Sequence, residues 1–126
     1  MNRRYKYFSL DEFDSPDEEG SGGMMEHEFV EQLDIARDIA GFPFIINSGF
    51  RSIAHNQRLK ERGYQVAKNS SHLLGWAADI HVSTSRKRFI MVEALLDAGF
   101  TRIGIGDNFI HVDSDPEKQQ NLIWTY

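Results

Sequence analysis

The segment from Ser70 to His81, Ser-Ser-His-Leu-Leu-Gly-Trp-Ala-Ala-Asp-Ile-His, constrains this chain more than any other part of the sequence. It places Asp79 inside an apolar run that follows His72. A carboxylate in such a run is expected to be half buried, and a buried carboxylate requires a partner. The segment from Phe109 to Asp113, Phe-Ile-His-Val-Asp, has the same character. The rest of the chain is therefore expected to bring these two segments together.

Composition excludes several classes of protein and of site. The chain carries 14 Lys and Arg against 19 Asp and Glu, a formal net charge of -5. A nucleic-acid-binding domain is usually basic, so no nucleic-acid partner is expected. The absence of cysteine excludes disulfides, thiolate zinc sites and a cysteine nucleophile, so His, Asp or Glu would have to hold any metal. The 126 residues fit one domain, residues 1–126, which we expect to be a monomer.

The N-terminal stretch from Met1 to Tyr7 is basic, but no apolar segment follows it. A signal peptide joins a basic region to an apolar one, and a membrane-spanning helix needs about 20 apolar residues. The sequence therefore indicates neither a signal peptide nor a membrane span. We expect synthesis in the cytoplasm, so action elsewhere would require release or transport by another factor.

Short strands alternate with amphipathic helices along the chain. Apolar residues at helical spacing, with Ser, Thr or Gly at the ends, predict helices over residues 24–40, 53–62 and 85–98. Runs rich in β-branched and aromatic residues predict strands over residues 42–48, 76–82, 100–105, 108–113 and 121–126. This alternation predicts an α+β fold with a small, mostly antiparallel sheet and helices packed on one side.

Three local patterns add detail to this prediction. Ser9 and Glu12 have the spacing of a capping box around a single turn. Residues 14–23 are acidic and then rich in Gly and Ser, which is typical of a solvated loop; cation binding by its carboxylates is the alternative. The apolar stripe of the last helix is expected to consist of Phe89, Val92, Leu95 and Leu96, with Ile90 and Met91 near its edge.

His72, Asp79 and His111 form a candidate metal site. Two imidazoles and one carboxylate are ligands that zinc accepts, and three protein ligands leave a fourth position for water. Strand alternation places Asp79 and His81 on one face, and likewise His111 and Asp113, so four polar side chains would share one patch of sheet. In that arrangement His81 and Asp113 would orient the ligands. Each histidine taken alone is better explained as an ordinary buried or surface residue.

Arg51 is expected in the turn between a strand and a helix, directly after Gly49 and Phe50. Side chains in such turns often face a functional site. A guanidinium group there is suited to a bidentate grip on a carboxylate. A surface salt bridge explains the position equally well.

The pattern Ser71-His72-x-x-Gly75-x-Ala77-x-Asp79, followed by His-Val-Asp at 111–113, resembles the zinc D-Ala-D-Ala carboxypeptidase family, peptidase family M15. The stretch from Asn47 to Ser52 matches the Ser-Gly-aromatic-Arg segment of that family. His55-Asn56 and the segment from Tyr7 to Phe13 match its phage-type subgroup. The resemblance covers most of the chain in the right order, and it implies the hedgehog/DD-peptidase fold.

This resemblance implies one Zn²⁺ ion held by His72, Asp79 and His111. It also implies that Arg51 binds the substrate or the developing oxyanion, and that Ser71 lies near the substrate. The substrate would be a stem or cross-link peptide of bacterial peptidoglycan, hydrolysed next to a D-amino acid by a carboxypeptidase or an endopeptidase. The setting would be phage or prophage, with the protein acting on the cell wall after release or as part of a virion.

The general base of the family has no obvious counterpart here. Several members carry Glu three residues before the last His ligand, or His two residues before it, where this chain has Asn108 and Phe109. Asp107, Asp113 and His81 are the nearest candidates, and Asp113 is favoured for a role in the site. The alternative is a zinc-containing module that binds peptidoglycan or a tail protein without cleavage, since the similar hedgehog signalling domain shows that such a site need not imply peptidase action.

Overall fold

The computed structural model describes residues 5–64 and 70–126. Most of the basic N-terminal stretch and of the polar segment after Gly63 lies outside these residues. The described helices are α1 (His27–Ala40), α2 (Ile53–Glu61) and α3 (Ser85–Asp97). The described strands are β1 (Ile46–Ser48), β2 (Ala77–His81), β3 (Arg102–Ile105), β4 (Phe109–Asp113) and β5 (Leu122–Thr125). Short 3₁₀ turns cover Leu10–Phe13, Ser21–Met24 and Ser71–Leu74.

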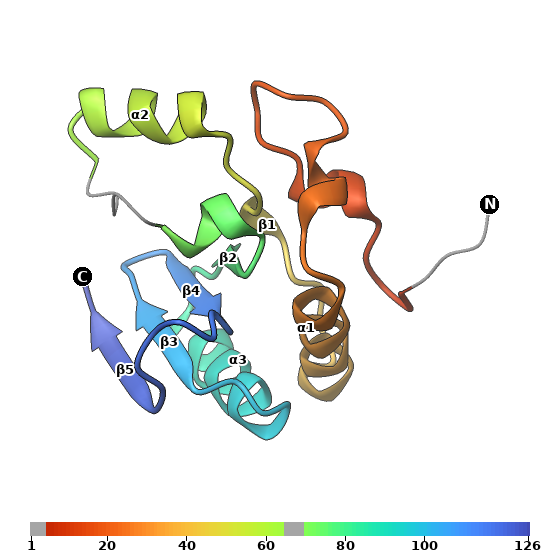
Figure 1. Ribbon diagram of the computed structural model, residues 1–126. Helices are drawn as coiled ribbons and strands as arrows, with labels where there is room; N and C mark the ends of the chain where they lie inside the picture. The colour runs from red at the N-terminus through yellow and green to blue at the C-terminus, as the bar shows by residue number, and fades with distance from the viewer. Residues whose placement is uncertain (1–4, 65–69) are drawn as a thin grey trace.

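The strands form a sheet in the order β1-β2-β4-β3-β5. Every neighbouring pair is antiparallel except β3 and β5, which are parallel (Figure 1). The register of β2 and β4 sets Asp79 opposite His111 and Ala77 opposite Asp113. The prediction of an α+β fold with a mostly antiparallel sheet is confirmed. The predicted strand over residues 121–126 is present as β5, but its parallel pairing with β3, which the chain reaches by crossing from β4 to the far side of β3, was not predicted.

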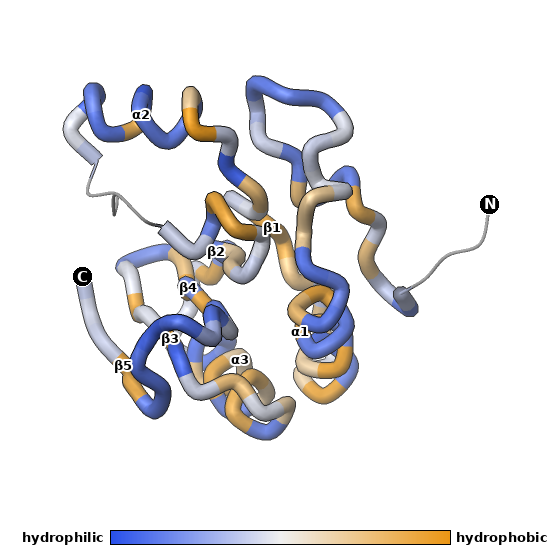
Figure 2. Tube along the Cα trace, viewed as in Figure 1, coloured by the Kyte–Doolittle hydropathy of each residue, from blue (hydrophilic) through white to orange (hydrophobic). Residues whose placement is uncertain are grey.

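The hydrophobic core lies where α1 and α3 pack together beside the sheet (Figure 1). Buried aromatic and aliphatic side chains from the helices and strands fill it, among them Phe29, Leu33, Leu95, Ile80 and Ile110. Helix α2 is different, because it lies apart from these two helices and is hydrophilic along most of its length (Figures 1 and 2). None of the described helices combines the length and the apolar character that crossing a membrane requires.

The expected apolar stripe of α3 is wrong in part. The buried residues of the helix are Met91, Ala94 and Leu95. Phe89 is 65% exposed and Leu96 is 45% exposed. A stripe at positions i, i+3 and i+4 from Met91 faces α1, and this narrow contact leaves the larger neighbouring side chains outside it.

The N-terminal region docks on the body of the protein instead of forming only a solvated loop. The predicted capping box of Ser9 and Glu12 is present. Within residues 14–23, the carboxylate of Asp14 accepts hydrogen bonds from backbone N–H groups of the same loop. Asp17 accepts from the Ser52 hydroxyl and lies 2.8 Å from Arg58 Nη2 on α2. These carboxylates therefore bind groups of the chain itself, and their contacts fix the loop beside α2.

Candidate metal centre

The sheet register and one 3₁₀ turn bring His72, Asp79 and His111 together. Asp79 and His111 are directly opposite each other on β2 and β4. His72 lies in the turn Ser71–Leu74 that leads into β2. Gly75 ends this turn with a φ of 80°, and a Cβ atom at that position would lie 2.5 Å from the Met24 carbonyl oxygen. Only glycine fits this path, which returns the chain from His72 to the start of β2.

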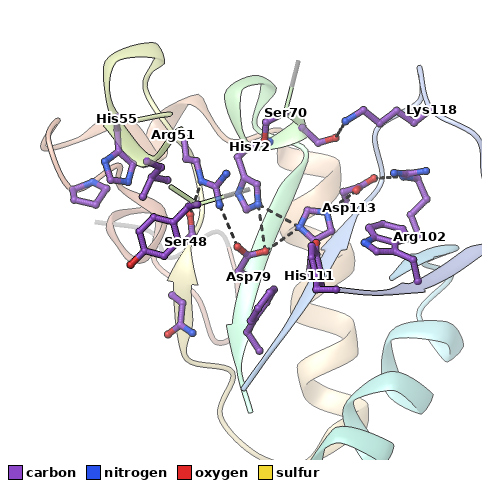
Figure 3. A pocket seen from close by; sticks show the side chains of 18 of the residues that line it. Ser48, Arg51, His55, Ser70, His72, Asp79, Arg102, His111, Asp113 and Lys118 are labelled. Carbon is purple, nitrogen blue, oxygen red and sulfur yellow. Dashed lines mark hydrogen bonds and ion pairs between the residues drawn. The ribbon is translucent and has the colours of Figure 1, made fainter. Parts of the chain in front are cut away.

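The three side chains point toward one another (Figure 3). His111 Nδ1 lies 2.9 Å from Asp79 Oδ1, and His72 Nε2 lies 3.3 Å from the same oxygen. The two imidazole nitrogens are 3.3 Å apart. One ligand atom from each residue thus falls within 4.8 Å of the others.

The second nitrogen of each imidazole has an acceptor outside this group. His72 Nδ1 donates to the carbonyl oxygen of Gly49 at 2.8 Å, and His111 Nε2 donates to Asp113 Oδ2 at 2.7 Å. In the neutral form of each ring, the nitrogen that faces Asp79 is then the unprotonated one. Two lone pairs and a carboxylate oxygen that converge without a donor repel one another unless a cation or a proton lies between them. This donor set fits a divalent metal ion with nitrogen and oxygen ligands.

The electrostatics of the site also favour positive charge at this point. Burial raises the pKa of Asp79, but His72 and His111 outweigh this effect and leave its pKa well below the usual range. Burial lowers the pKa of His72, which favours the neutral ring that a metal requires. Burial also lowers the pKa of His111, but Asp113 and Asp79 on either side more than compensate and raise it.

Arg51 contacts the free side of the same carboxylate. Its Nη2 lies 3.2 Å from Asp79 Oδ2, and its Nε donates to Ser48 Oγ at 3.1 Å. The backbone N–H of Arg51 also donates to the carbonyl oxygen of His72. The contact with Asp79 is through one nitrogen instead of the expected bidentate pair. The ion pair is nevertheless part of the site and is largely buried, in contrast to a surface salt bridge.

Asp113 is buried behind His111, and its oxygens are both occupied. Oδ2 accepts from His111, while Oδ1 accepts from Arg102 Nε at 2.7 Å and from the backbone N–H of Asp115. Burial raises the pKa of Asp113, but His111 and Arg102 outweigh it and keep the pKa low. This geometry fits a carboxylate that orients His111, and it leaves no oxygen directed at a water in the cleft.

Sequence reasoning missed Arg102, which holds Asp113 in place. Its Nη1 donates to the carbonyl oxygen of Gln119 at 2.6 Å, and its guanidinium lies 5.0 Å from the Trp124 ring centroid. Arg102 is on β3 and Asp113 is on β4, so the pair becomes visible only once the order of the strands is known.

The structure does not bring His81 and Asp107 to the metal ligands. His81 is exposed at the end of β2, opposite Phe109. It shares a face with Asp79, but two residues of strand separate them by about 7 Å. Asp107 is exposed in the turn before β4, and its carbonyl oxygen accepts from Arg88. Neither residue lines the cleft, so the expectation that they serve as partners or as a base is not supported by their positions.

The ligands lie in a cleft with a cavity volume of about 960 Å³. Its lining includes Pro16 from the N-terminal loop, His55 on α2, Tyr64, and the aromatic residues of β5 and its end, Trp124 and Tyr126. Burial lowers the pKa of His55, which favours the neutral form of its imidazole. Sequence reasoning had given β5 no role here, although alternation along a strand places Trp124 and Tyr126 on one face.

Gly104 lets the aromatic side chains of β5 reach the cleft. It is the register partner of His111 and of Trp124. A Cβ atom on Gly104 would lie 2.6 Å from Trp124 Nε1 and 2.9 Å from the Tyr126 ring. Without that atom, the Trp124 ring approaches to 5.7 Å from the His111 ring, between centroids. The position of the aromatic residues in the wall of the cleft therefore depends on glycine at position 104 of the neighbouring strand.

Ser71 lines the cleft beside His72. Its hydroxyl donates to Asp115 Oδ2 at 2.8 Å, and its oxygen accepts from Lys118 Nζ at 2.8 Å. Asp115 and Lys118 belong to the segment between β4 and β5, which the sequence had not connected to the site.

Comparison with known proteins agrees with the resemblance. A family model described as Peptidase M15 matches residues 6–113. Peptidoglycan L,D-endopeptidase MepK of Escherichia coli strain K12 is 36% identical to this chain over 77 residues, which make up 60% of this chain and 42% of MepK. MepK of Shigella flexneri matches to the same extent. The match thus spans less than half the length of these relatives. The predicted family is confirmed, and the chain belongs to the peptidase M15 family.

Proposed function

We propose that this protein is a zinc-dependent peptidase that hydrolyses amide bonds next to D-amino acids in peptidoglycan peptides. The observation that carries the proposal is the convergence of His72 Nε2, His111 Nδ1 and Asp79 Oδ1 on one point of an open cleft. Membership of the M15 family supports peptide hydrolysis. The likeness to MepK, a peptidoglycan L,D-endopeptidase, supports the substrate class and favours cleavage of an internal bond.

Two imidazoles and one carboxylate that leave a coordination position open form one of the ligand sets of catalytic zinc in metallopeptidases. When bound, it would supply Lewis acidity to the scissile carbonyl and to the attacking water. His72, Asp79 and His111 would hold it through the three atoms that already face one another.

Other residues of the site would orient these ligands and stabilise charge on the substrate. Asp113 and the Gly49 carbonyl keep the two imidazoles in the tautomers that ligation requires. Arg51 lines the cleft beside Asp79, where its positive charge would stabilise the oxyanion that forms as the amide carbonyl is attacked. Hydrogen-bond donors of this kind act mainly in the transition state and so raise kcat.

One observation favours a second candidate function, binding without cleavage. Among the described residues, the carboxylates that line the cleft are Asp79 and Asp113, and each is already engaged by histidine and arginine. Among the described residues that line the cleft, His55 is then a candidate proton acceptor for the attacking water, since burial favours its neutral form. If His55 does not serve, the protein would be a zinc-containing module that binds peptidoglycan.

The test uses the zinc-loaded protein and defined cross-linked muropeptides, with products separated and identified by mass spectrometry. We expect cleavage of an internal amide that stops on chelation and returns with added zinc. His72→Ala serves as the inactive control. Stoichiometric zinc and retention on purified sacculi without any product would favour the binding module and overturn the peptidase. Release of a terminal D-amino acid alone would instead identify a carboxypeptidase.

We also propose that the protein acts as a monomer on the cell wall, after release from a phage-infected cell or as part of a virion. The match of residues 7–13 and 55–56 to the phage-type subgroup supports this setting. Light scattering on the zinc-loaded protein tests the monomer, and an assembled dimer at micromolar concentration would contradict it.

A further inference from the structure

We propose that Lys118 forms a subsite for a carboxylate group of the peptide substrate. In Figure 3, Lys118 and Arg51 lie on opposite sides of His72, so a peptide placed across the metal ligands has a cation near each side. The inference rests on the proposed function, since it assumes that the cleft binds a peptide.

The backbone around Lys118 is fixed by the turn Asp115-Pro116-Glu117-Lys118. The N–H of Lys118 donates to the carbonyl oxygen of Asp115, and the N–H of Glu117 donates to Asp115 Oδ1 at 3.0 Å. Pro116 occupies the second position of the turn, where its restricted φ is favourable. The side-chain amide of Gln120 donates to the carbonyl oxygen of Lys118 at 2.8 Å. Lys118 is thus presented to the cleft from an ordered segment.

The ammonium group of Lys118 has donors to spare. It donates to Ser71 Oγ at 2.8 Å. Asp115 Oδ2, at 3.8 Å, is beyond hydrogen-bond distance and accepts instead from the Ser71 hydroxyl. An ammonium carries three N–H donors, and the bond to Ser71 uses one of them. A carboxylate is the ligand class that gains most from such a group, because both partners are charged.

Comparison with the other cations of the cleft singles out Lys118. Arg51 and Arg102 have side chains 12% and 11% exposed, and each lies within hydrogen-bond distance of a carboxylate. The Lys118 side chain is 26% exposed, lines the cleft, and lacks a carboxylate at that distance among the described residues. Its ion pair with Asp115 Oδ2, at 3.8 Å, is longer than those of Arg51 and Arg102, so a substrate carboxylate can approach Lys118 without displacing a carboxylate at hydrogen-bond distance.

Two carboxylate sources exist in a stem peptide, a side-chain group and the C-terminus, and matched substrates distinguish them. The test measures kcat and KM of the zinc-loaded protein on a peptide and on its two single carboxamides, one terminal and one internal. We expect amidation of the recognised group to lower kcat/KM about tenfold or more, mainly through KM. Lys118→Gln should lower kcat/KM similarly on the acid and scarcely on the amide. Lys87→Gln, an exposed lysine on α3, is the matched control and should change neither.

Two results would overturn the inference while leaving the peptidase intact. The first is equal cleavage of the acid and both amides by the unmodified protein. The second is an equal loss on acid and amide in Lys118→Gln, which would mean that Lys118 only supports Ser71. Zinc content and circular dichroism check that the variant is folded and loaded.

Binding measurements separate this subsite from catalysis. The same peptides with the scissile amide N-methylated are titrated against the zinc-loaded protein by calorimetry. We expect the acid to bind about tenfold more tightly than the amide, and Lys118→Gln to remove this difference. If no peptide is cleaved but this preference is found, the proposed function fails and the carboxylate subsite stands. Equal binding of acid and amide would overturn the subsite.

Discussion

The two histidines of the candidate metal centre are held in different ways. His72 donates to a neutral backbone carbonyl, that of Gly49, at 2.8 Å. His111 donates to the carboxylate of Asp113 at 2.7 Å, and Arg102 holds that carboxylate in turn. The pKa of His72 is lowered by burial, whereas that of His111 is raised by its two carboxylate neighbours despite burial. A carboxylate partner makes an imidazole a stronger ligand, so His111 should contribute more than His72 to metal affinity.

The two arginines of the site contact different carboxylates and are expected to have different roles. Arg102 is buried behind Asp113 and acts on the metal ligands only through it. Arg51 contacts Asp79 on the other side and lines the cleft. Loss of Arg102 should therefore change metal affinity, and loss of Arg51 should change turnover.

The largest effect is expected for Asp79, because it faces both histidines. Asp79→Ala should abolish stoichiometric zinc binding, since it removes a ligand and leaves the two imidazole lone pairs without a shared anion. Elemental analysis of the purified protein measures this directly. Asp107→Ala, in an exposed turn, should retain zinc. Full zinc occupancy in Asp79→Ala would show that the ligand set is misassigned.

Arg51→Ala should retain zinc and lose turnover. Removal of one donor to a developing oxyanion typically lowers kcat by roughly 10²–10³-fold. Steady-state kinetics with parallel zinc analysis separates the two quantities, and Arg86→Ala, exposed on α3, controls for loss of a positive charge. A variant that loses zinc along with activity would instead place Arg51 among the residues that support Asp79.

Asp113→Asn tests the contribution of the carboxylate that accepts from His111. The amide can still accept from His111, but it lacks the negative charge, and zinc affinity should fall about 10- to 100-fold. Competition with a fluorescent zinc chelator measures the change, with Asp107→Asn as the matched control. Arg102→Gln should give a smaller loss of affinity in the same assay. Unchanged affinity in Asp113→Asn would mean that the two histidines are equivalent ligands after all.

Gly49→Ala tests the contribution of the neutral carbonyl that accepts from His72. A Cβ atom at this position would lie 2.7 Å from Phe13 Cα, so the backbone that offers its carbonyl to His72 must shift. We expect a loss of about 1–3 kcal/mol in the free energy of unfolding, as for other overpacked sites, and a smaller fall in zinc affinity than in Asp113→Asn. Urea denaturation and the chelator competition measure both. Gly23→Ala, where nothing lies within 4 Å, should match the parent protein, and equal stability of Gly49→Ala would contradict the close packing.

The candidate metal ligands could be identified from the sequence because each lies in a distinctive segment, although Asp79 and His111 meet only through the pairing of β2 and β4. Asp79 and His111 lie in apolar runs with the side-chain alternation of a strand, and Gly75 marks the turn that leads from His72 to Asp79. Alternation was also why His81 was expected with them, and it failed because alternation fixes a face without showing where the cleft ends.

The remaining parts of the site depend on the order of the strands in the sheet, which could not be predicted from the sequence. Arg102 meets Asp113 only because β3 pairs with β4. Lys118 and Trp124 reach the cleft only because the chain crosses from β4 to the far side of β3 and adds β5 in parallel. No motif near these residues records that crossing.

At Gly104, strand propensity and the shape of the cleft favour different residues. Its φ lies outside the left-handed region, so alanine is sterically acceptable to its own backbone there. By strand propensity alone, alanine would stabilise the sheet by about 0.5–1 kcal/mol, and an engineer seeking a more heat-resistant protein would choose it. The added methyl group would instead push Trp124 and Tyr126 out of the cleft. The gain in strand propensity is therefore offset by the cost of displacing Trp124, and alanine chosen for its propensity alone would remove part of the cleft wall.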